Sequence, residues 1–290
     1  MLICRTAAEM HAACRSLRNT EHTLGLVPTM GALHAGHLSL VSAAIQQNDA
    51  VAASIFVNPT QFGPNEDLAS YPRTFDDDCA KLESAGTHLL FAPSAAEIYP
   101  PGNTTFVDPG PIATRLDGAS RPGHFRGVAT IVTRLFSIIA PDRAYFGQKD
   151  AAQVAVLRHI VRDLNLPVSL VVCPIVREPD GLALSSRNRY LSPAERTRAL
   201  VLSRALRAAE SLARSGVTSA ETLRAAMLAV FAAADPDPSV NAVPVRLDYA
   251  AVVDPDTLLP LADTRSGTLL AVAAHIGATR LIDNALLLSQ

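Results

Sequence analysis

Through the first 176 residues, short apolar runs alternate with segments whose apolar residues recur every three or four positions. The second spacing places side chains on one face of a helix, whereas a short apolar run between turn residues is typical of a buried strand. Strands that alternate with helices favour a parallel sheet covered by helices, so the expected class is α/β, a Rossmann-like doubly wound sheet. The runs predict strands at 2–3, 24–27, 50–57, 87–91, 142–146 and 168–172.

After residue 176 the alternation stops, and helices are followed by strands. Ser192 and Glu195 form a capping box, which predicts a helix that continues to about residue 214. Thr218 and Glu221 predict the start of a second helix in the same way. We therefore expect a domain at 1–176 and a smaller α+β C-terminal domain at 177–290. Antiparallel strands of that domain are expected at 245–253, 268–274 and 279–288.

Composition argues against several classes of protein. The formal net charge is −2, whereas a nucleic-acid partner would favour a basic surface. No apolar run approaches the roughly 20 residues that span a membrane, and the N-terminus does not resemble a secretion signal. The four cysteines show no paired spacing, as is usual in a reducing compartment. We expect a soluble cytoplasmic protein.

The stretch that follows the strand at 24–27 carries the first candidate chemistry. Pro28 is expected to end the strand, and two glycines nearby permit a tight turn before a helix. The first N–H groups of a helix lack partners within it, so a phosphate can bind there. His34 and His37 lie at this turn, where both imidazoles can face the same oxygen atoms. Two unrelated surface histidines and a metal site are the other interpretations of the pair, but no third metal ligand follows at useful spacing.

Two further polar segments are candidates for phosphate binding. Gly147 and Gln148 end the strand at 142–146, and Lys149 and Asp150 come next, where they can face a phosphate and a ribose hydroxyl. Near the domain boundary, residues 185–187 place two hydroxyls and a guanidinium in succession, and arginine binds phosphate oxygens in a bidentate fashion. Each segment alone is common in surface loops. Their combination with the two histidines indicates a nucleotide site.

The His-Ala-Gly-His sequence at 34–37 resembles the His-x-Gly-His signature of the nucleotidylyltransferase superfamily. The full set of motifs resembles the pantoate–β-alanine ligase (pantothenate synthetase) family within it. The wider superfamily carries Lys-Met-Ser-Lys-Ser where this chain has residues 183–187 and neither lysine, so Lys149 and Arg187 are expected to meet the phosphate charge. The matching segments are 28–37, 57–62, 71–73, 121–128, 146–150, 180–188, 253–255 and 279–284.

The resemblance implies ATP-dependent condensation of pantoate with β-alanine through a pantoyl adenylate, with release of AMP and pyrophosphate. It assigns pantoate to Gln61 and Gln153, whose amides can both donate and accept hydrogen bonds, and places β-alanine near Gln61 as well. Mg²⁺ is expected to bridge the phosphates without a dedicated protein metal site. The resemblance also implies a homodimer and a C-terminal domain that acts as a lid.

The same resemblance assigns an ATP site and a catalytic set. Catalysis is assigned to His34, His37, Lys149, Ser185, Ser186 and Arg187. The ATP site comprises Met30, Gly31, Ala32, Leu33, His34, Ala35, Gly36, His37, Gly147, Gln148, Lys149, Asp150, Val176, Leu184, Ser185, Ser186 and Arg187.

Other functions stay open at this stage. A related nucleotidylyltransferase acting on a phosphate-bearing substrate would need additional cations, and the glutamine pair argues against it. A non-enzymatic ATP-binding regulator would tolerate loss of the histidines or Lys149, and a tRNA-charging enzyme is disfavoured by the acidic charge. His124 and Arg126 are interpreted as structural residues at a helix start, and 76–78 as the acidic first turn of a helix.

Overall fold

A computed structural model of the chain describes residues 1–18, 22–64, 66–234 and 243–287. Residue 288, predicted as the end of the last strand, lies outside these ranges. The chain forms two compact units. The first comprises Met1–Gln148 with Val156–Pro174, and the second comprises Lys149–Ala155 with Ile175–Gln290. Every helix within the described ranges is too short or too polar to span a lipid bilayer.

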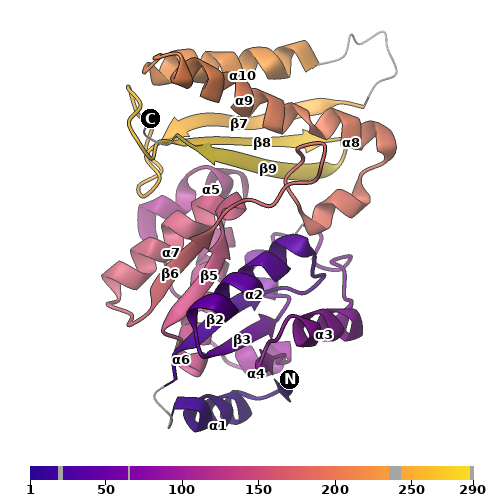
Figure 1. The fold of residues 1–290 in the computed structure, drawn as a ribbon, viewed down its shortest axis with the longest axis vertical. Helices are drawn as coiled ribbons and strands as arrows, with labels where there is room; N and C mark the ends of the chain where they lie inside the picture. Colours follow the sequence, from indigo (N-terminus) through magenta and orange to yellow (C-terminus); the bar gives the residue numbers. More distant parts are fainter. Residues whose placement is uncertain (19–21, 65, 235–242, 288–290) are drawn as a thin grey trace. The chain divides into compact units, whose positions relative to one another are not determined.

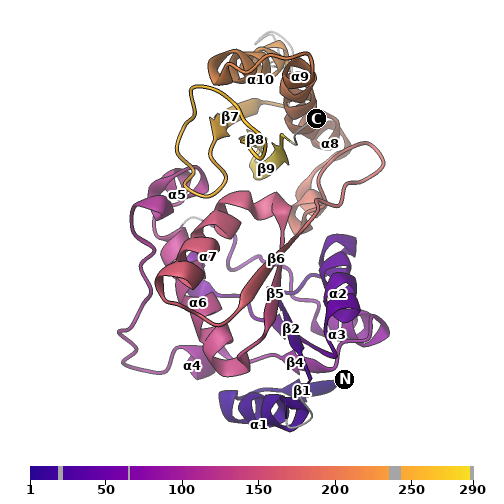
Figure 2. The same cartoon turned by 60° about the vertical axis from the view of Figure 1, so that its left-hand side comes forward.

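The first unit is built on a parallel six-stranded sheet with the order β1-β4-β3-β2-β5-β6, whose strands are labelled between Figure 1 and Figure 2. From β2 the chain proceeds outward to β3 and β4, whereas from β5 it proceeds to β6 on the other side. Such a reversal of strand order is where ligands bind in open α/β sheets. The strands are β1 Leu2–Cys4, β2 Leu24–Thr29, β3 Ala50–Ile55, β4 Leu89–Phe91, β5 Arg143–Gly147 and β6 Ser169–Cys173.

Helices cover both faces of this sheet, which confirms the doubly wound α/β fold expected from the sequence. Figure 2 shows α2 and α3 on one face and α6 on the other, and α1 packs against α6. Helix α7 begins in the second unit and continues in the first. The segment after β4, expected to be irregular, contains the short helix α4. The bounds are α1 Ala7–Arg18, α2 Ala35–Gln47, α3 Phe75–Ser84, α4 Ala95–Ile98, α5 Asp117–Ser120, α6 His124–Ile139 and α7 Ala151–Asp163, with 3₁₀ helices η1 Pro59–Gln61, η2 Gly110–Thr114 and η3 Gln148–Asp150.

Strand β2 does not end at Pro28, so the prediction that this proline terminates the strand was wrong. Thr29 still pairs with β3, because its carbonyl accepts from the Phe56 N–H at 3.1 Å. Successive residues of a strand direct their N–H and C=O groups to opposite neighbours, so the Pro28 nitrogen faces β5. The described pairing of β2 with β5 covers only Gly25 and Leu26. The missing N–H of Pro28 therefore removes no hydrogen bond from the sheet.

The second unit packs helices against an antiparallel three-stranded sheet in the order β7-β8-β9. Helix α9 contacts β8 and β9, and α10 contacts β7, so both lie on the same side of the sheet (Figure 1). The bounds are α8 Pro193–Ala199, α9 Val201–Arg214, α10 Ala220–Ala234, β7 Val245–Val253, β8 Leu269–Ile276 and β9 Thr279–Leu286, with the 3₁₀ helix η4 Ser186–Tyr190.

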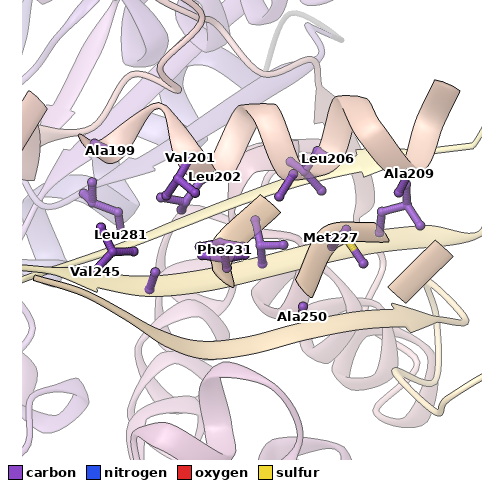
Figure 3. Packing of buried hydrophobic residues seen from close by; sticks show 14 of the residues in the cluster. Ala199, Val201, Leu202, Leu206, Ala209, Met227, Phe231, Val245, Ala250 and Leu281 are labelled. Atoms are coloured by element: carbon purple, nitrogen blue, oxygen red, sulfur yellow. The ribbon is translucent and has the colours of Figure 1, made fainter. Parts of the chain in front are cut away.

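A hydrophobic core joins these helices to the sheet (Figure 3). This unit therefore has an apolar core of its own. Burying one large aliphatic or aromatic side chain in such a core stabilises a fold by roughly 1.5–3 kcal/mol. Labelled members of the core are Ala199, Val201, Leu202, Leu206, Ala209, Met227, Phe231, Val245, Ala250 and Leu281.

Two helix boundaries of this unit differ from the sequence prediction. The capping box of Ser192 and Glu195 is confirmed, but the helix is interrupted at Leu200, whose ψ of −13° departs from helical geometry. The next helix is capped by Ser219, which accepts from the Thr222 N–H at 3.3 Å, and not by Thr218. The Thr218 carbonyl instead accepts from the Thr264 N–H at 2.7 Å, which holds this residue outside the helix.

Helix α6 and η1 approach each other backbone to backbone at Gly127. A Cβ atom there would lie 2.3 Å from the Thr60 carbonyl oxygen and 2.6 Å from the Gln61 nitrogen. We expect Gly127→Ala to destabilise the protein by about 1–3 kcal/mol, because overpacking forces these backbones apart. The urea midpoint measures the change. Gly63→Ala is the control, because its Cβ would meet Glu66 at an ordinary 3.7 Å. Equal midpoints for the two variants would contradict the close approach.

Candidate active site

The turn that joins β2 to α2 is a tight loop. Gly31 has φ of +81° and Ala32 has φ of +52°, in the left-handed region that favours glycine. A Cβ atom on Gly31 would lie 3.1 Å from Asp78 Oδ2 and 3.2 Å from Ile55 Cγ2. Glycine at position 31 therefore lets the turn lie directly against β3 and α3.

A buried carboxylate holds this turn. Asp78 Oδ2 accepts from the Ala32 N–H at 2.8 Å, and Oδ1 accepts from the Leu33 N–H at 2.7 Å. The Thr74 hydroxyl donates to the same carboxylate at 3.1 Å. Asp78 is fully buried, so its interpretation as one of three acidic first-turn residues was incomplete. Its side chain instead satisfies the amides of the turn.

The two histidines form the first turn of α2. His34 is the N-cap, and its Nδ1 accepts from the Gly36 N–H at 3.1 Å. His37 Nδ1 accepts from the His34 N–H at 3.3 Å, which completes a capping box. The ring centroids are 4.1 Å apart. Because each Nδ1 acts as an acceptor, each neutral ring carries its hydrogen on Nε2, where it can be donated to an anion.

A cavity of about 340 Å³ adjoins the turn, and Met30, Gly31 and Phe56 are among the residues that line it. Its lining also includes Arg5 and Arg73, whose guanidinium groups supply positive charge. The Arg5 guanidinium lies 4.5 Å from the centre of the Phe75 ring. A space of this size can hold a small organic acid.

Gln61 lies at the end of η1 with its side chain buried. Its Nε2 donates to Met30 Sδ at 3.1 Å, so the structure brings this substrate-site candidate to the turn that carries the histidines. Its Oε1 accepts from Asn58 Nδ2 at 3.0 Å. Asn58 is 1% exposed and was not among the candidate site residues, although it lies in the segment at 57–62 that carried the resemblance.

The main chain of Gln61 is held by a buried histidine. His124 Nδ1 lies 2.8 Å from the Gln61 carbonyl oxygen, which can only accept, so Nδ1 carries the hydrogen. His124 Nε2 then accepts from Arg121 Nη1 at 3.0 Å. Burial, reinforced by the Arg121 charge, lowers the pKa of His124 to about 4. His124 therefore supports Gln61 as a neutral group.

Arg121 is held in turn by Glu66, with Nε and Nη2 donating to its two carboxylate oxygens at 2.7 and 2.6 Å. Burial alone would raise the pKa of Glu66, but hydrogen bonds and charge from Arg121 outweigh burial and lower it. Arg126 has a different role, because its guanidinium lies over the Phe106 ring at 4.1 Å. His124 therefore supports the site, whereas the described contact of Arg126 is with Phe106.

Of the candidates that follow β5, Gln148 belongs to the first unit, whereas Lys149 and Asp150 belong to the second. Lys149 Nζ pairs with Asp150 Oδ1 at 3.2 Å, and the Lys149 carbonyl accepts from Asn284 Nδ2 at 2.9 Å. Asn284 lies in β9, within the matched segment at 279–284. Gln153 follows in α7 and is half-buried. The convergence of Lys149 and Gln153 with the histidines remains a prediction.

The remaining ATP-site candidates are neighbours within the second unit. The Leu184 N–H donates to the Val176 carbonyl at 2.9 Å. Ser185 caps η4 and its Oγ accepts from the Arg187 N–H at 3.3 Å, so residues 185–187 form one ordered turn. A bidentate pair of Arg177 with Asp283, at 2.7 and 2.9 Å, ties this segment to β9.

Comparison with known proteins shows similarity along the whole chain. A family model described as pantoate-beta-alanine ligase matches residues 2–286. The pantothenate synthetase of Koribacter versatilis is 57% identical, over 99% of this chain and 96% of that protein. The pantothenate synthetase of Roseiflexus sp. is 55% identical over 99% of both.

Solved structures extend this similarity to the fold. Pantothenate synthetase from Thermus thermophilus has a TM-score of 0.91 at 48% identity, covering 100% of both chains. Pantoate-beta-alanine ligase from Francisella tularensis, complexed with beta-gamma ATP and beta-alanine, has a TM-score of 0.79 at 35% identity. The match covers 99% of this chain and 97% of that one, so it includes both units.

The depressed pKa of His124 predicts a loss of stability in acid. Below the usual histidine pKa near 6.5, the unfolded chain takes up a proton that the folded protein excludes until about pH 4. Stability should therefore fall between about pH 6.5 and 4, by up to roughly 3 kcal/mol from this group. In His124→Gln that part of the pH dependence should disappear. Urea midpoints across this range measure it.

His11→Gln, at an exposed position of α1, is the matched control and should keep the wild-type slope. If His124→Gln also keeps the wild-type slope, His124 is not the neutral buried group described here.

Proposed function

The chain belongs to the pantoate–β-alanine ligase family, and we propose that the site at the carboxyl ends of β2 and β3 carries out that ligation. ATP and pantoate form an enzyme-bound pantoyl adenylate with release of pyrophosphate, and β-alanine then displaces AMP to give pantothenate. The family match over both units favours this ligation over nucleotidyl transfer to a phosphate-bearing substrate. The observation that supports the proposal most strongly is the His34–His37 capping box, which makes both Nε2 atoms donors at a helix N-terminus.

In the first half-reaction a pantoate carboxylate oxygen forms a bond to the α-phosphorus, and the bond from that phosphorus to the bridging oxygen of pyrophosphate breaks. The substrates supply both the nucleophile and the leaving group, so the protein contributes position and charge stabilisation. We assign His34 and His37 to the phosphate oxygens, where negative charge shifts toward pyrophosphate. In the second half-reaction the β-alanine nitrogen attacks the activated carbonyl carbon, loses a proton, and AMP leaves with the bonding electron pair.

We propose that segments of the second unit complete the ATP site. Lys149 and Arg187 would supply the cations, because the superfamily's two lysines at 183–187 are missing from this chain. Ser185 and Ser186 would donate hydroxyls from the ordered turn that precedes η4. On the family resemblance, residues 147–150 and Leu184 face the nucleotide and Val176 lies beside the adenine. Residues 177–290 then act as the lid domain proposed from the sequence.

Gln61 and Gln153 are proposed to bind pantoate. Burial of Gln61 beside Met30 supports its part in this assignment. Met30 also lines the cavity of about 340 Å³, which can hold a small acid against the turn that precedes α2. The position of Gln153 rests on the family resemblance.

Mg²⁺ is proposed as the metal of the ATP complex. Within the described part of the chain, no group of three or more His, Cys, Asp or Glu side chains is placed to hold a metal ion. On the family resemblance, the ion would be carried on phosphate oxygens and would keep most of its water. When bound, the ion would neutralise charge on the transferred nucleotide's phosphates. We also propose, on the family resemblance, that the enzyme is a cytoplasmic homodimer.

Pyrophosphate release should require pantoate but not β-alanine, because adenylation precedes amide formation. Rapid-quench assays with ATP and each acid, alone and together, measure the release. Pantoate alone should give a burst of about one pyrophosphate per site. If pyrophosphate forms only when β-alanine is also present, the adenylate sequence is wrong.

His37→Ala and Lys149→Ala should slow adenylation far more than amide formation. Donors that meet developing charge on the leaving group stabilise the transition state more than bound ATP, and removing one typically costs ~10²–10³ in rate. Once pantoyl adenylate exists, pyrophosphate has left, so supplied pantoyl adenylate should react with β-alanine at a nearly normal rate. Single-turnover kinetics of each half-reaction separate the two steps. Equal damage to both would remove these residues from the adenylation role.

A further inference from the structure

We propose that Tyr99 is a positioning residue for substrate recognition, which acts through Asn58 to fix the Gln61 side-chain amide so that it only donates. This inference rests on the proposed function, because it takes Gln61 as a pantoate contact. It adds a residue that carries no sequence motif and lies just after α4, in a segment expected to be irregular.

Backbone groups determine the orientation of the Asn58 amide. Asn58 Nδ2 donates to the Gly127 carbonyl at 3.1 Å, and a carbonyl oxygen can only accept. Asn58 Oδ1 accepts from the Thr60 N–H at 3.4 Å, and a backbone N–H can only donate. Flipping the amide would place Oδ1 against the Gly127 carbonyl oxygen, so two acceptors would meet. It would also place Nδ2 against the Thr60 N–H, so two donors would meet. The Nδ2 and Oδ1 ends of Asn58 are therefore fixed.

Tyr99 strengthens this orientation. Its hydroxyl donates to Asn58 Oδ1 at 2.8 Å and lies 3.0 Å from the Thr60 hydroxyl, which also donates to Oδ1 at 3.0 Å. Burial raises the pKa of Tyr99, so the hydroxyl keeps its proton at neutral pH. Its ring lies beneath the Arg134 guanidinium at 5.0 Å, which restrains its position.

The fixed amide of Asn58 determines what Gln61 can offer. The second Nδ2 hydrogen is donated to Gln61 Oε1 at 3.0 Å, so Oε1 faces Asn58 and Nε2 faces Met30. A thioether sulfur is a weak acceptor, and a substrate oxygen would be a stronger partner for the same N–H group. The sequence predicted that the Gln61 amide both donates to and accepts from the substrate. With Oε1 occupied by Asn58, we infer that it only donates to the substrate, through Nε2.

This polarity selects the chemistry of the bound group. A carboxylate or hydroxyl oxygen can accept from Gln61 Nε2, whereas an ammonium group cannot. Pantoate offers both kinds of oxygen. The ammonium group of β-alanine therefore finds no hydrogen-bond acceptor in the Gln61 Nε2 group, whereas a carboxylate does find a donor there.

A double-mutant cycle tests the relay from Tyr99 to Gln61. Tyr99→Phe removes one hydrogen bond from Asn58 and should weaken pantoate binding about 3- to 10-fold. Gln61→Ala should weaken it roughly 10-fold or more. The double variant should lose no more than Gln61→Ala alone, because Tyr99 acts through that side chain. Calorimetric titration with pantoate, and separately with ATP, gives the affinities, and ATP binding should change less than 2-fold.

Tyr145→Phe is the matched control. Tyr145 is also buried, and its hydroxyl accepts from Asn48 Nδ2 at 2.7 Å, outside the Asn58 network. It should leave pantoate affinity unchanged. Gln61→Glu supplies the polarity test, because it keeps an acceptor toward Asn58 but presents an oxygen to the substrate, so pantoate binding should be lost while ATP binding remains.

The outcomes separate this proposal from the proposed function. Wild-type protein that neither binds pantoate nor releases pyrophosphate with it would overturn the function itself. Wild-type protein that does both, with additive losses from Tyr99→Phe and Gln61→Ala, would overturn the relay alone. Equal weakening of pantoate and ATP by Tyr99→Phe would likewise show a general structural role in place of positioning.

Discussion

The candidate site depends on one buried carboxylate. Asp78 accepts hydrogen bonds from the Ala32 and Leu33 amides in the turn after β2. The chain can therefore adopt left-handed geometry at Gly31 and Ala32 while both of these amides stay paired. A buried unpaired donor costs about 1–3 kcal/mol, and two would make this turn unstable. This turn determines where α2 begins, and therefore where His34 and His37 lie.

Support for Gln61 is organised differently from support for the histidines. The histidines are held by the helix that they start, whereas Gln61 is held by Asn58 at the start of η1 and by two residues of α6. Asn58 holds its side chain, His124 holds its carbonyl, and Gly127 allows α6 to approach it closely. The histidine capping box is thus local to the start of α2, whereas the position of the proposed acid-binding amide depends on tertiary packing.

This difference explains how much the sequence could predict. The strands, the helix after the histidines and the Ser192 capping box depend on neighbouring residues, so their pattern is visible in the chain. The role of Asp78 depends on a partner 46 positions away, and that of Tyr99 on one 41 positions away. Pro28 was misjudged because its tolerance depends on the pairing of β5 with β2. Partners so distant in the sequence can be identified only when the fold is known.

The use of imidazole nitrogens as helix caps joins folding and ligand binding in one segment. If the first turn of α2 frays, the Nδ1 contacts break and both rings lose the orientation that directs Nε2 outward. Conversely, an anion held by Nε2 would oppose fraying and slow solvent exchange of the His34 and Gly36 amide hydrogens. Order in this first helical turn and occupancy of the proposed phosphate site would then be two aspects of a single equilibrium.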